Sequence, residues 1–504
     1  MALHDILFGP FPLTLGILSI SLYWVLWYLR RGKQAQAQTQ TVTDGPPFYP
    51  FDPAALDRKE PYFTQSETPI LTFGNSMILP NRYAHEIRNN DHLSFRDGLE
   101  KDFLTTVPGL EALFTGTFHN DIVWDTASAF SRQISALIEP LSTETGIFLQ
   151  ENWGDDAEWH SIPLNDSMHL LIAQLTARIF IGEELCRDRA WIQLDISYTA
   201  HRTAAIKELP QYGRLIPIVH WFLPSCRALR ACVRAARPFV ERVLEARREQ
   251  AQGQGKKQRE SIDALSWIDG VAGRTKYDPT LTQLRLAYAA VHTTSDMMAK
   301  VVAAICEHDE LIQPLREEIV AVVKEHGWSE AALAKMVLLD SVLKETQRLE
   351  PLASFTLSRI AREAVVLSDG TRIPKGTQVR LTTDNMWNSS VYPDAAKFDG
   401  YRFVRLRDQD TATGTATATG TPSGGLSFVS VSANHMGFGY GKHACPGRFF
   451  AGAETKIALC HVLLKYDVEL VDGGLAGAQT DGMMIWRDKR AMLRVRRRSG
   501  EIEV

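Results

Sequence analysis

The residues best placed to do chemistry lie in a glycine-rich loop near the C-terminus, FGYGKHACPGRFFA, residues 438–451. Its single cysteine, Cys445, stands just before an apolar stretch that favours a helix. A thiolate at a helix N-terminus is stabilised by the helix dipole and by free backbone N–H groups. The glycines of the loop would let the backbone approach a flat, bulky group closely. A buried structural cysteine is the alternative, but it leaves the surrounding glycine, aromatic and basic residues unexplained.

The spacing of this loop, Phe438-x-x-Gly441-x-His443-x-Cys445-x-Gly447, resembles the haem-binding loop of the cytochrome P-450 superfamily. The resemblance implies haem b as the cofactor, with Cys445 as the axial ligand of its iron. Such a thiolate pushes electron density towards cleavage of the O–O bond. It also implies that His443, at a position more often occupied by arginine, bonds a haem propionate. Phe438 would pack near the sulfur, and Gly441 would form the tight turn.

A carboxylate and a guanidinium lie one helical turn apart in MVLLDSVLKETQRLEP, residues 336–351. The i, i+3 spacing places Glu345 and Arg348 on one face of the predicted helix. An exposed salt bridge of little energy is the alternative for such a pair. The segment Tyr401-Arg402-Phe403 resembles the one that completes a buried Glu-Arg-Arg cluster behind the haem loop of this superfamily. The resemblance implies that Glu345, Arg348 and Arg402 hold this loop in place and are structural.

A long helix is predicted from Leu281 to Ile305, where apolar residues recur with helical spacing. Asp278 is a favourable N-cap, and Pro279 suits the first helical position. The polar run HTTS at residues 292–295 interrupts the apolar pattern. Polar groups inside a buried helix are costly unless they are partnered or functional. A second helix start, capped within this run, is the alternative interpretation.

The stretch AAVHTT, residues 289–294, resembles the distal oxygen-binding groove of the superfamily. The resemblance implies that the Thr293 hydroxyl hydrogen-bonds bound dioxygen and guides its protonation. The small side chain of Ala290 would leave room for the oxygen. His292 departs from the usual pattern, because the superfamily commonly has Asp or Glu at this position. Histidine can also relay protons, so His292 is a candidate for the same catalytic task.

Two arginines are candidates for further contacts with the haem propionates. Arg359, in SRIA after the helix that contains Glu345, matches a position of the superfamily that reaches the other propionate. Arg132, together with Trp124, would make the corresponding contact from an early helix. The usual W-x-x-x-R spacing is absent at these two residues.

The remaining pattern predicts a mainly α protein with a minor β component, an α+β fold. Helical spacing also marks Asp166–Ile181 and Ala228–Arg248, whereas strand-like stretches separated by turn residues lie between Glu363 and Leu381. A Thr/Gly-rich segment, Asp408–Gly425, is predicted to be a surface loop. With the haem motifs, this pattern predicts the cytochrome P-450 fold behind an N-terminal transmembrane helix.

The N-terminal run FPLTLGILSISLYWVLWYL, residues 11–29, is uncharged and long enough to cross a bilayer of about 30 Å as a helix. Aromatic residues close it, and Arg30, Arg31 and Lys33 follow. A cleaved signal peptide would have its positive charges before the run. We therefore expect a single-pass anchor in the endoplasmic reticulum membrane, in contact with lipid, and a catalytic domain on the cytosolic face.

The predicted organisation is a membrane anchor at residues 1–33, a polar and proline-rich linker at 34–54, and a haem-thiolate monooxygenase domain at 55–504. The prolines between residues 46 and 53 preclude a long helix in the linker. The 504 residues carry a net charge of −4, with basic residues scattered along the chain, which argues against a nucleic-acid partner. Six cysteines without a C-x-x-C pair argue against a disulfide scaffold, a zinc ribbon or a thioredoxin-type site.

Within the superfamily, the chain is most similar to members from filamentous fungi that oxidise terpenoids and alkaloids. The resemblance implies insertion of one oxygen atom from O₂ into a small apolar substrate, with electrons from NADPH. No G-x-G-x-x-G fingerprint for a nucleotide is present, so a separate NADPH–cytochrome reductase is the expected partner. A haem-thiolate isomerase, dehydratase or peroxide-using enzyme is one alternative. A haem electron carrier is the other, with His292 as its conceivable sixth ligand.

Overall fold

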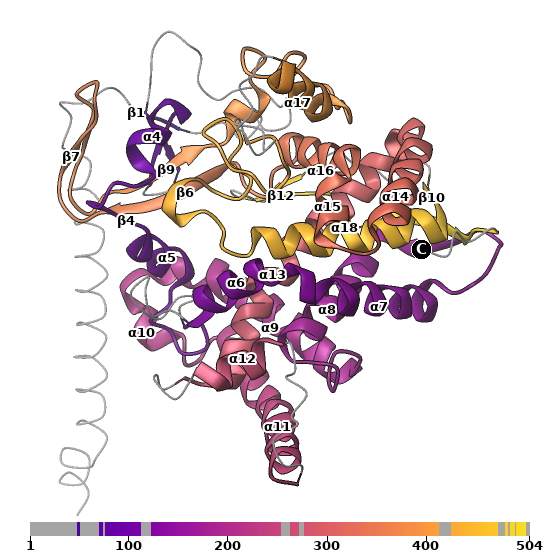
Figure 1. Ribbon diagram of the computed structural model, residues 1–504. Coiled ribbons are helices and arrows are strands. Elements are labelled where there is room, and N and C mark those ends of the chain that lie inside the picture. Colours follow the sequence, from indigo (N-terminus) through magenta and orange to yellow (C-terminus); the bar gives the residue numbers. More distant parts are fainter. Residues whose placement is uncertain are drawn as a thin grey trace, which may run out of the picture.

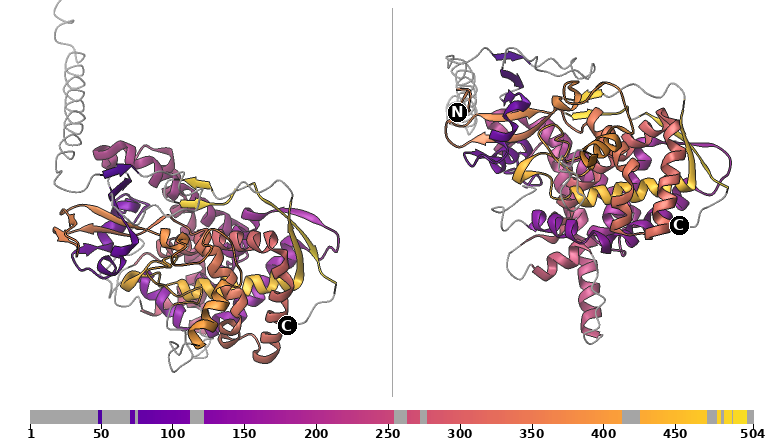
Figure 2. Two further views of the ribbon diagram at one scale, coloured as in Figure 1. Left: turned by 90° about the horizontal axis from the view of Figure 1, so that it is seen from above. Right: turned by 45° about the horizontal axis from the view of Figure 1, so that its top comes forward.

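A computed structural model describes residues 48–50, 70–73, 76–111, 122–253, 263–271, 277–412, 425–471, 479–481, 484–488 and 490–499. The chain forms a helical body with a six-stranded sheet to one side of it (Figures 1 and 2). This agrees with the predicted class, mainly α with a minor β component.

The helices of the first half are α4 (Ala84–Ile87), α5 (Phe95–Phe103), α6 (Ile122–Arg132), α7 (Ile134–Trp153), α8 (Leu164–Phe180), α9 (Arg189–Glu208), α10 (Ile216–Val219) and α11 (Pro224–Gly253). Those of the second half are α12 (Ala264–Val271), α13 (Pro279–Glu307), α14 (Ile312–His326), α15 (Glu330–Lys335), α16 (Val337–Leu349), α17 (Arg402–Ala412) and α18 (Arg448–Lys465). The helices predicted around residues 166–181, 228–248 and 281–305 are confirmed as α8, α11 and α13.

The main sheet has the strand order β1-β2-β3-β9-β6-β4, formed by β1 (Phe48–Pro50), β2 (Ile70–Phe73), β3 (Ser76–Leu79), β9 (Gln378–Thr382), β6 (Phe355–Ala361) and β4 (Leu93–Ser94). A second sheet has the order β10-β13-β5, formed by β10 (Tyr466–Leu470), β13 (Met492–Arg497) and β5 (His160–Pro163). Two hairpins complete the β component, β7 (Val365–Val366) with β8 (Arg372–Ile373), and β11 (Gln479–Asp481) with β12 (Met484–Trp486). The strands predicted between residues 363 and 381 are β7, β8 and β9.

The helix α13 runs through the hydrophobic core and packs on α8, α16 and α18. It begins as the sequence predicts, because the Asp278 carboxylate accepts the backbone N–H of Leu281 at 3.1 Å and Pro279 follows the cap. The helix continues without a break to Glu307. The alternative of a second helix start within residues 292–295 is therefore wrong.

The surface loop predicted at Asp408–Gly425 was placed too early in the sequence, because its first residues are helical. α17 extends to Ala412, and the Thr411 hydroxyl donates back to the carbonyl of Arg407 at 2.9 Å. This bond to the carbonyl four residues back satisfies the Thr411 hydroxyl within the helix. Residues 413–424 lie outside the described residues.

Part of the predicted linker belongs to the main sheet. β1, at Phe48–Pro50, pairs in parallel with β2. The apolar run at residues 11–29 lies outside the described residues. Among the residues that are described, no helix has the length and apolar character needed to span a membrane.

Candidate active site

The loop before α18 is shaped by two glycines with positive φ, Gly439 at +75° and Gly441 at +81°. A Cβ at Gly441 would lie 2.6 Å from the Asn89 side-chain oxygen and 2.8 Å from the Arg88 Cβ, so this position needs glycine for space as well as for conformation. The loop then closes, because the backbone N–H of Cys445 donates to the carbonyl of Phe438 at 2.8 Å.

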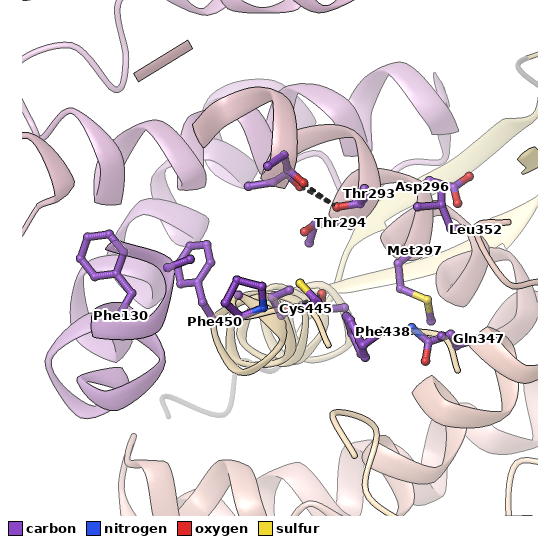
Figure 3. Close-up of a pocket in the computed structure, with 18 of the residues that line it drawn as sticks. Phe130, Thr293, Thr294, Asp296, Met297, Gln347, Leu352, Phe438, Cys445 and Phe450 are labelled. Atoms are coloured by element: carbon purple, nitrogen blue, oxygen red, sulfur yellow. Dashed lines mark hydrogen bonds between the residues drawn. The ribbon is translucent and has the colours of Figure 1, made fainter. Parts of the chain in front are cut away.

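Cys445 and α13 form opposite walls of a cavity of about 300 Å³. Figure 3 shows the Cys445 sulfur facing Thr293 and Thr294. Aromatic and aliphatic side chains supply most of the remaining lining, including Phe130, Phe180, Leu286, Met297, Phe438 and Phe450. A Cβ at Gly447 would meet no atom within 4 Å, so this lining glycine leaves the cavity beside the sulfur open. The cavity can therefore hold a flat, apolar group between the two walls.

The Cys445 thiol is exposed, but the surface that it exposes belongs to the cavity. The surrounding protein still withholds bulk water, and this burial raises the pKa of the thiol. The backbone N–H groups of Gly447 and Arg448 and the charge of Arg448 act in the opposite direction. The site offers these N–H groups to a thiolate, and a bound metal ion would add the charge needed to hold it deprotonated.

Thr293 and Ala290 also line the cavity. The Thr293 hydroxyl donates to the carbonyls of Ala289 and Ala290, at 3.1 and 3.2 Å. Because the hydroxyl is exposed to the cavity, its oxygen remains able to accept a hydrogen bond from a molecule there.

His292 lies on another face of α13 and is not part of the cavity wall. Its ring meets His169 of α8 edge to face at 5.3 Å between centroids, and Tyr288 at 5.8 Å. The structure thus turns the His292 ring away from the cavity that Cys445 and Thr293 line, so the ring does not face Cys445 as a sixth iron ligand would. The proton relay proposed for His292 stays a prediction.

Arg359 and His443 lie together around Phe95. The His443 ring stacks on Phe95 at 4.8 Å, and the Arg359 guanidinium lies 4.9 Å from the centre of the same ring. Arg359 is 2% exposed, and among the described residues it forms no salt bridge. Burial lowers its pKa to about 10. Burial, with the charges of Arg359 and Lys442, lowers the pKa of His443 to about 3.

This cluster fits a haem at Cys445. An uncompensated buried cation is costly, and an anionic group beside Arg359 and His443 would remove that cost. Haem propionates are such groups, and the loop that carries His443 also carries the candidate thiolate ligand. The Cys445 sulfur is a soft donor that faces an apolar cavity, and a cysteine thiolate is one of the protein ligands that bind haem iron.

Arg132 does not join this cluster. It is exposed at the end of α6 and does not line the cavity, and neither does Trp124. The absence of the usual W-x-x-x-R spacing is consistent with this placement. The contact between α6 and the loop comes from a residue that the sequence did not mark: the Ser131 hydroxyl donates to the carbonyls of Pro446, at 2.5 Å, and Ala127, at 2.9 Å.

Glu345, Arg348 and Arg402 form one buried cluster. Arg348 donates to both Glu345 carboxylate oxygens at 2.8 Å, and Arg402 Nε lies 3.0 and 3.1 Å from the same oxygens. The exposed fractions of their side chains are 0% for Glu345, 0% for Arg348 and 7% for Arg402. Arg348 also donates to the carbonyls of Met386 and Ala395, at 2.5 and 2.7 Å. The cluster therefore ties α16 to the segment that precedes α17.

Four polar residues that line the cavity were not singled out from the sequence: Asp296, Gln347, Glu350 and Thr455. Asp296 lies three residues after Thr293, a helical spacing that could have marked it. Gln347 and Glu350 flank Arg348, but their orientation depends on how α16 meets the loop, which no local pattern predicts.

Comparison with known proteins agrees with this geometry. Residues 117–494 match the family model described as Cytochrome P450. The chain is 81% identical over 496 residues to Cytochrome P450 monooxygenase cle4 of Aspergillus versicolor, covering 98% of this chain and 96% of the relative. It is 40% identical over 423 residues to Fumitremorgin C monooxygenase of Neosartorya fischeri, covering 84% of this chain and 82% of the relative.

The fold recurs in a distant solved structure, retinoic acid-bound cyanobacterial CYP120A1. The TM-score is 0.61 at 16% identity, covering 84% of this chain and 89% of that chain. The family model alone spans well over half of the sequence, and the closely similar fungal relative extends the match to almost all of it. The chain therefore belongs to the cytochrome P450 family of haem-thiolate monooxygenases.

Proposed function

We propose that this enzyme inserts one oxygen atom from O₂ into a C–H bond of a small apolar molecule, an intermediate of fungal secondary metabolism of the terpenoid or alkaloid kind. The main observation that supports this proposal is that Cys445 and Thr293 lie on facing walls of one apolar cavity. One relative is named Fumitremorgin C monooxygenase, which makes fumitremorgin C a reasonable first compound to test.

Cys445 would be the axial ligand of haem b, and Arg359 and His443 would bind its propionates. When bound, the haem supplies the chemistry of dioxygen activation. The residues of the chain position and protect this chemistry. The apolar wall orients the substrate and excludes water. The exclusion of water strengthens the electrostatic interactions in the cavity. The Thr293 hydroxyl, fixed by the carbonyls of Ala289 and Ala290, can accept a proton from one neighbour while it donates to another.

Electrons would come from NADPH through a separate reductase. The sequence has no G-x-G-x-x-G fingerprint for nucleotide binding, which supports the need for a separate reductase. The test is coexpression with a fungal NADPH–cytochrome reductase, followed by mass spectrometry of a terpenoid and alkaloid panel that includes fumitremorgin C. Products should gain one oxygen atom, incorporate label from ¹⁸O₂ and require NADPH, and Cys445→Ala should form none. Products that form with peroxide alone, or rearranged products without added oxygen, would contradict the proposal.

The enzyme would be anchored in the endoplasmic reticulum membrane, with its catalytic domain on the cytosolic face. The apolar run at residues 11–29 and the basic residues after it support this location. An exposed apolar patch gives independent support, because Ile218, Trp221 and Phe222 are 62%, 53% and 74% exposed. Such residues favour the membrane interface.

Deletion of the residues before Pro46 should release part of the protein from membranes and leave haem incorporation intact. Adding Trp221→Asp and Phe222→Asp to the truncated chain should release most of the remainder. Vesicle co-sedimentation and haem content are the measurements. Loss of haem from the truncated chain would instead show that the N-terminal segment is part of the fold.

A further inference from the structure

Three hydroxyls follow one another on α13, at Thr293, Thr294 and Ser295, and their contacts differ. The Thr293 hydroxyl donates to two carbonyls of the preceding turn, at 3.1 and 3.2 Å. The Ser295 hydroxyl donates to the carbonyl of His292 at 3.1 Å, and Ser295 is not among the described residues of the cavity wall. The protons of these two hydroxyls are therefore held by the helix itself.

Thr294 is the member of this run whose hydroxyl is not engaged. The residue is 4% exposed and lines the cavity. Figure 3 shows it across the cavity from the Cys445 sulfur. Among the residues that the structure describes, none forms a hydrogen bond with this hydroxyl. Buried polar groups are nearly always satisfied, so a buried hydroxyl in this state marks a place where a bound molecule supplies the partner.

The two threonines offer the cavity opposite halves of a hydrogen bond. A hydroxyl has one proton to donate and lone pairs with which it accepts. Because the Thr293 proton is directed at carbonyls of α13, Thr293 meets a molecule in the cavity as an acceptor. The Thr294 hydroxyl still has its proton and can donate it.

The other polar side chains of the cavity wall are engaged elsewhere. The Thr455 hydroxyl donates to a carbonyl of its own helix at 2.8 Å. The carboxylates of Asp296 and Glu350 are paired with buried cations behind the wall. The Gln347 side-chain oxygen lies against the loop, where a Cβ on Gly437 would collide with it. The unengaged hydroxyl on α13 is thus the donor best placed to meet a small molecule opposite the sulfur.

We infer that Thr294 is a second catalytic hydroxyl, which donates a hydrogen bond to the small ligand held opposite Cys445, while Thr293 accepts one. The inference rests on the proposed function, because it requires a haem on Cys445. A ligand on the other face of that haem would meet the wall that α13 forms. A donor in this position stabilises negative charge that develops on the ligand, and the apolar surroundings strengthen the effect.

The test measures ligand binding to the haem-loaded enzyme, without reductase or substrate. Cyanide is the probe, because it binds ferric haem through carbon and leaves its nitrogen as an acceptor. Thr294→Val replaces the hydroxyl by a methyl group at nearly constant volume. This change should weaken cyanide binding about three- to tenfold, the ratio expected for one hydrogen bond. Thr294→Ser keeps the hydroxyl and should retain most of the affinity.

Thr293→Val and Ser295→Ala are the matched controls. Each removes a neighbouring hydroxyl from the same helix, but the proton of that hydroxyl is directed at a helix carbonyl. Both variants should bind cyanide within about twofold of the wild type. A second measurement is the infrared C–O stretch of the ferrous carbon monoxide adduct. Donation to the ligand oxygen lowers this frequency, so it should rise in Thr294→Val and stay unchanged in Ser295→Ala.

An unchanged cyanide affinity and C–O stretch in folded, haem-loaded Thr294→Val would overturn the inference. A larger effect of Thr293→Val than of Thr294→Val would also overturn it, because Thr293 would then be the donor. If the valine variant binds no haem, Thr294→Ala replaces it in the same comparison. The proposed function fails separately, because these measurements need no turnover. The expected cyanide series without any oxygenated product would contradict the proposed function alone.

Discussion

Replacing Arg348 by alanine should cost the enzyme its haem-loaded state. The change removes two hydrogen bonds of 2.8 Å to Glu345 and two to the carbonyls of Met386 and Ala395. Breaking one partner of a buried ion pair costs about 3–5 kcal/mol. A stability of about 5–15 kcal/mol is typical of a folded protein, so this loss is a large share of the total.

The matched control is Arg362→Ala. Arg362 binds Asp97 with the same two-pronged geometry, and both distances are again 2.8 Å. Its side chain is 58% exposed, so the loss should be about 0–1 kcal/mol. Arg348→Lys should fall between the two, since lysine keeps the charge but lacks the planar fork that meets Glu345 and the carbonyls together.

The assay is haem content per chain, combined with urea unfolding of whatever folded protein is recovered. Arg348→Ala should yield little or no haem-loaded protein, and Arg362→Ala should be close to wild type. An Arg348→Ala enzyme that keeps its haem and unfolds within about 1 kcal/mol of wild type would refute the argument that burial makes this cluster essential.

Other predictions follow from the cavity and its loop. Thr293→Val is nearly isosteric, so substrate binding should persist. A smaller fraction of the NADPH consumed should yield oxygenated product, because the hydroxyl is lost. An unchanged ratio of product to NADPH would show that another group, such as Thr294, directs the proton. Gly441→Ala should reduce haem incorporation because of its positive φ and the 2.6 Å approach to Asn89. Gly146→Ala, within α7, should be tolerated, because a Cβ there would meet only the flexible Lys465 ammonium, at 3.4 Å. Similar haem contents in these two glycine variants would contradict the packing argument.

Local sequence patterns predicted much of the site. A cap and an N-terminal proline define the start of α13, and an i, i+3 spacing defines the Glu345–Arg348 pair, because both depend on residues within one or two helical turns. The shape of the loop before Cys445 follows from glycines whose positive φ no other residue adopts easily. These features need no knowledge of distant contacts.

Features that depend on the packing of distant elements could not be predicted in the same way. The helical pattern alone does not say that His292 turns towards His169 of α8. The residue of α6 that contacts the loop around Cys445 is Ser131 and not the predicted Arg132. The rotation of α6 about its axis determines which of the two faces the loop. Asp296, on α13, and Glu350, just after α16, come to line one cavity only in the folded chain.

The central claim is that Cys445 is the thiolate ligand of a haem. The absorption spectrum of the reduced carbon monoxide adduct tests it most directly, in freshly prepared, folded protein. We predict the strongly red-shifted Soret band of thiolate ligation in the wild type, and its loss in Cys445→Ala together with all oxygenase activity. A histidine-type spectrum in the folded wild-type protein, or an unchanged spectrum in Cys445→Ala, would contradict the claim.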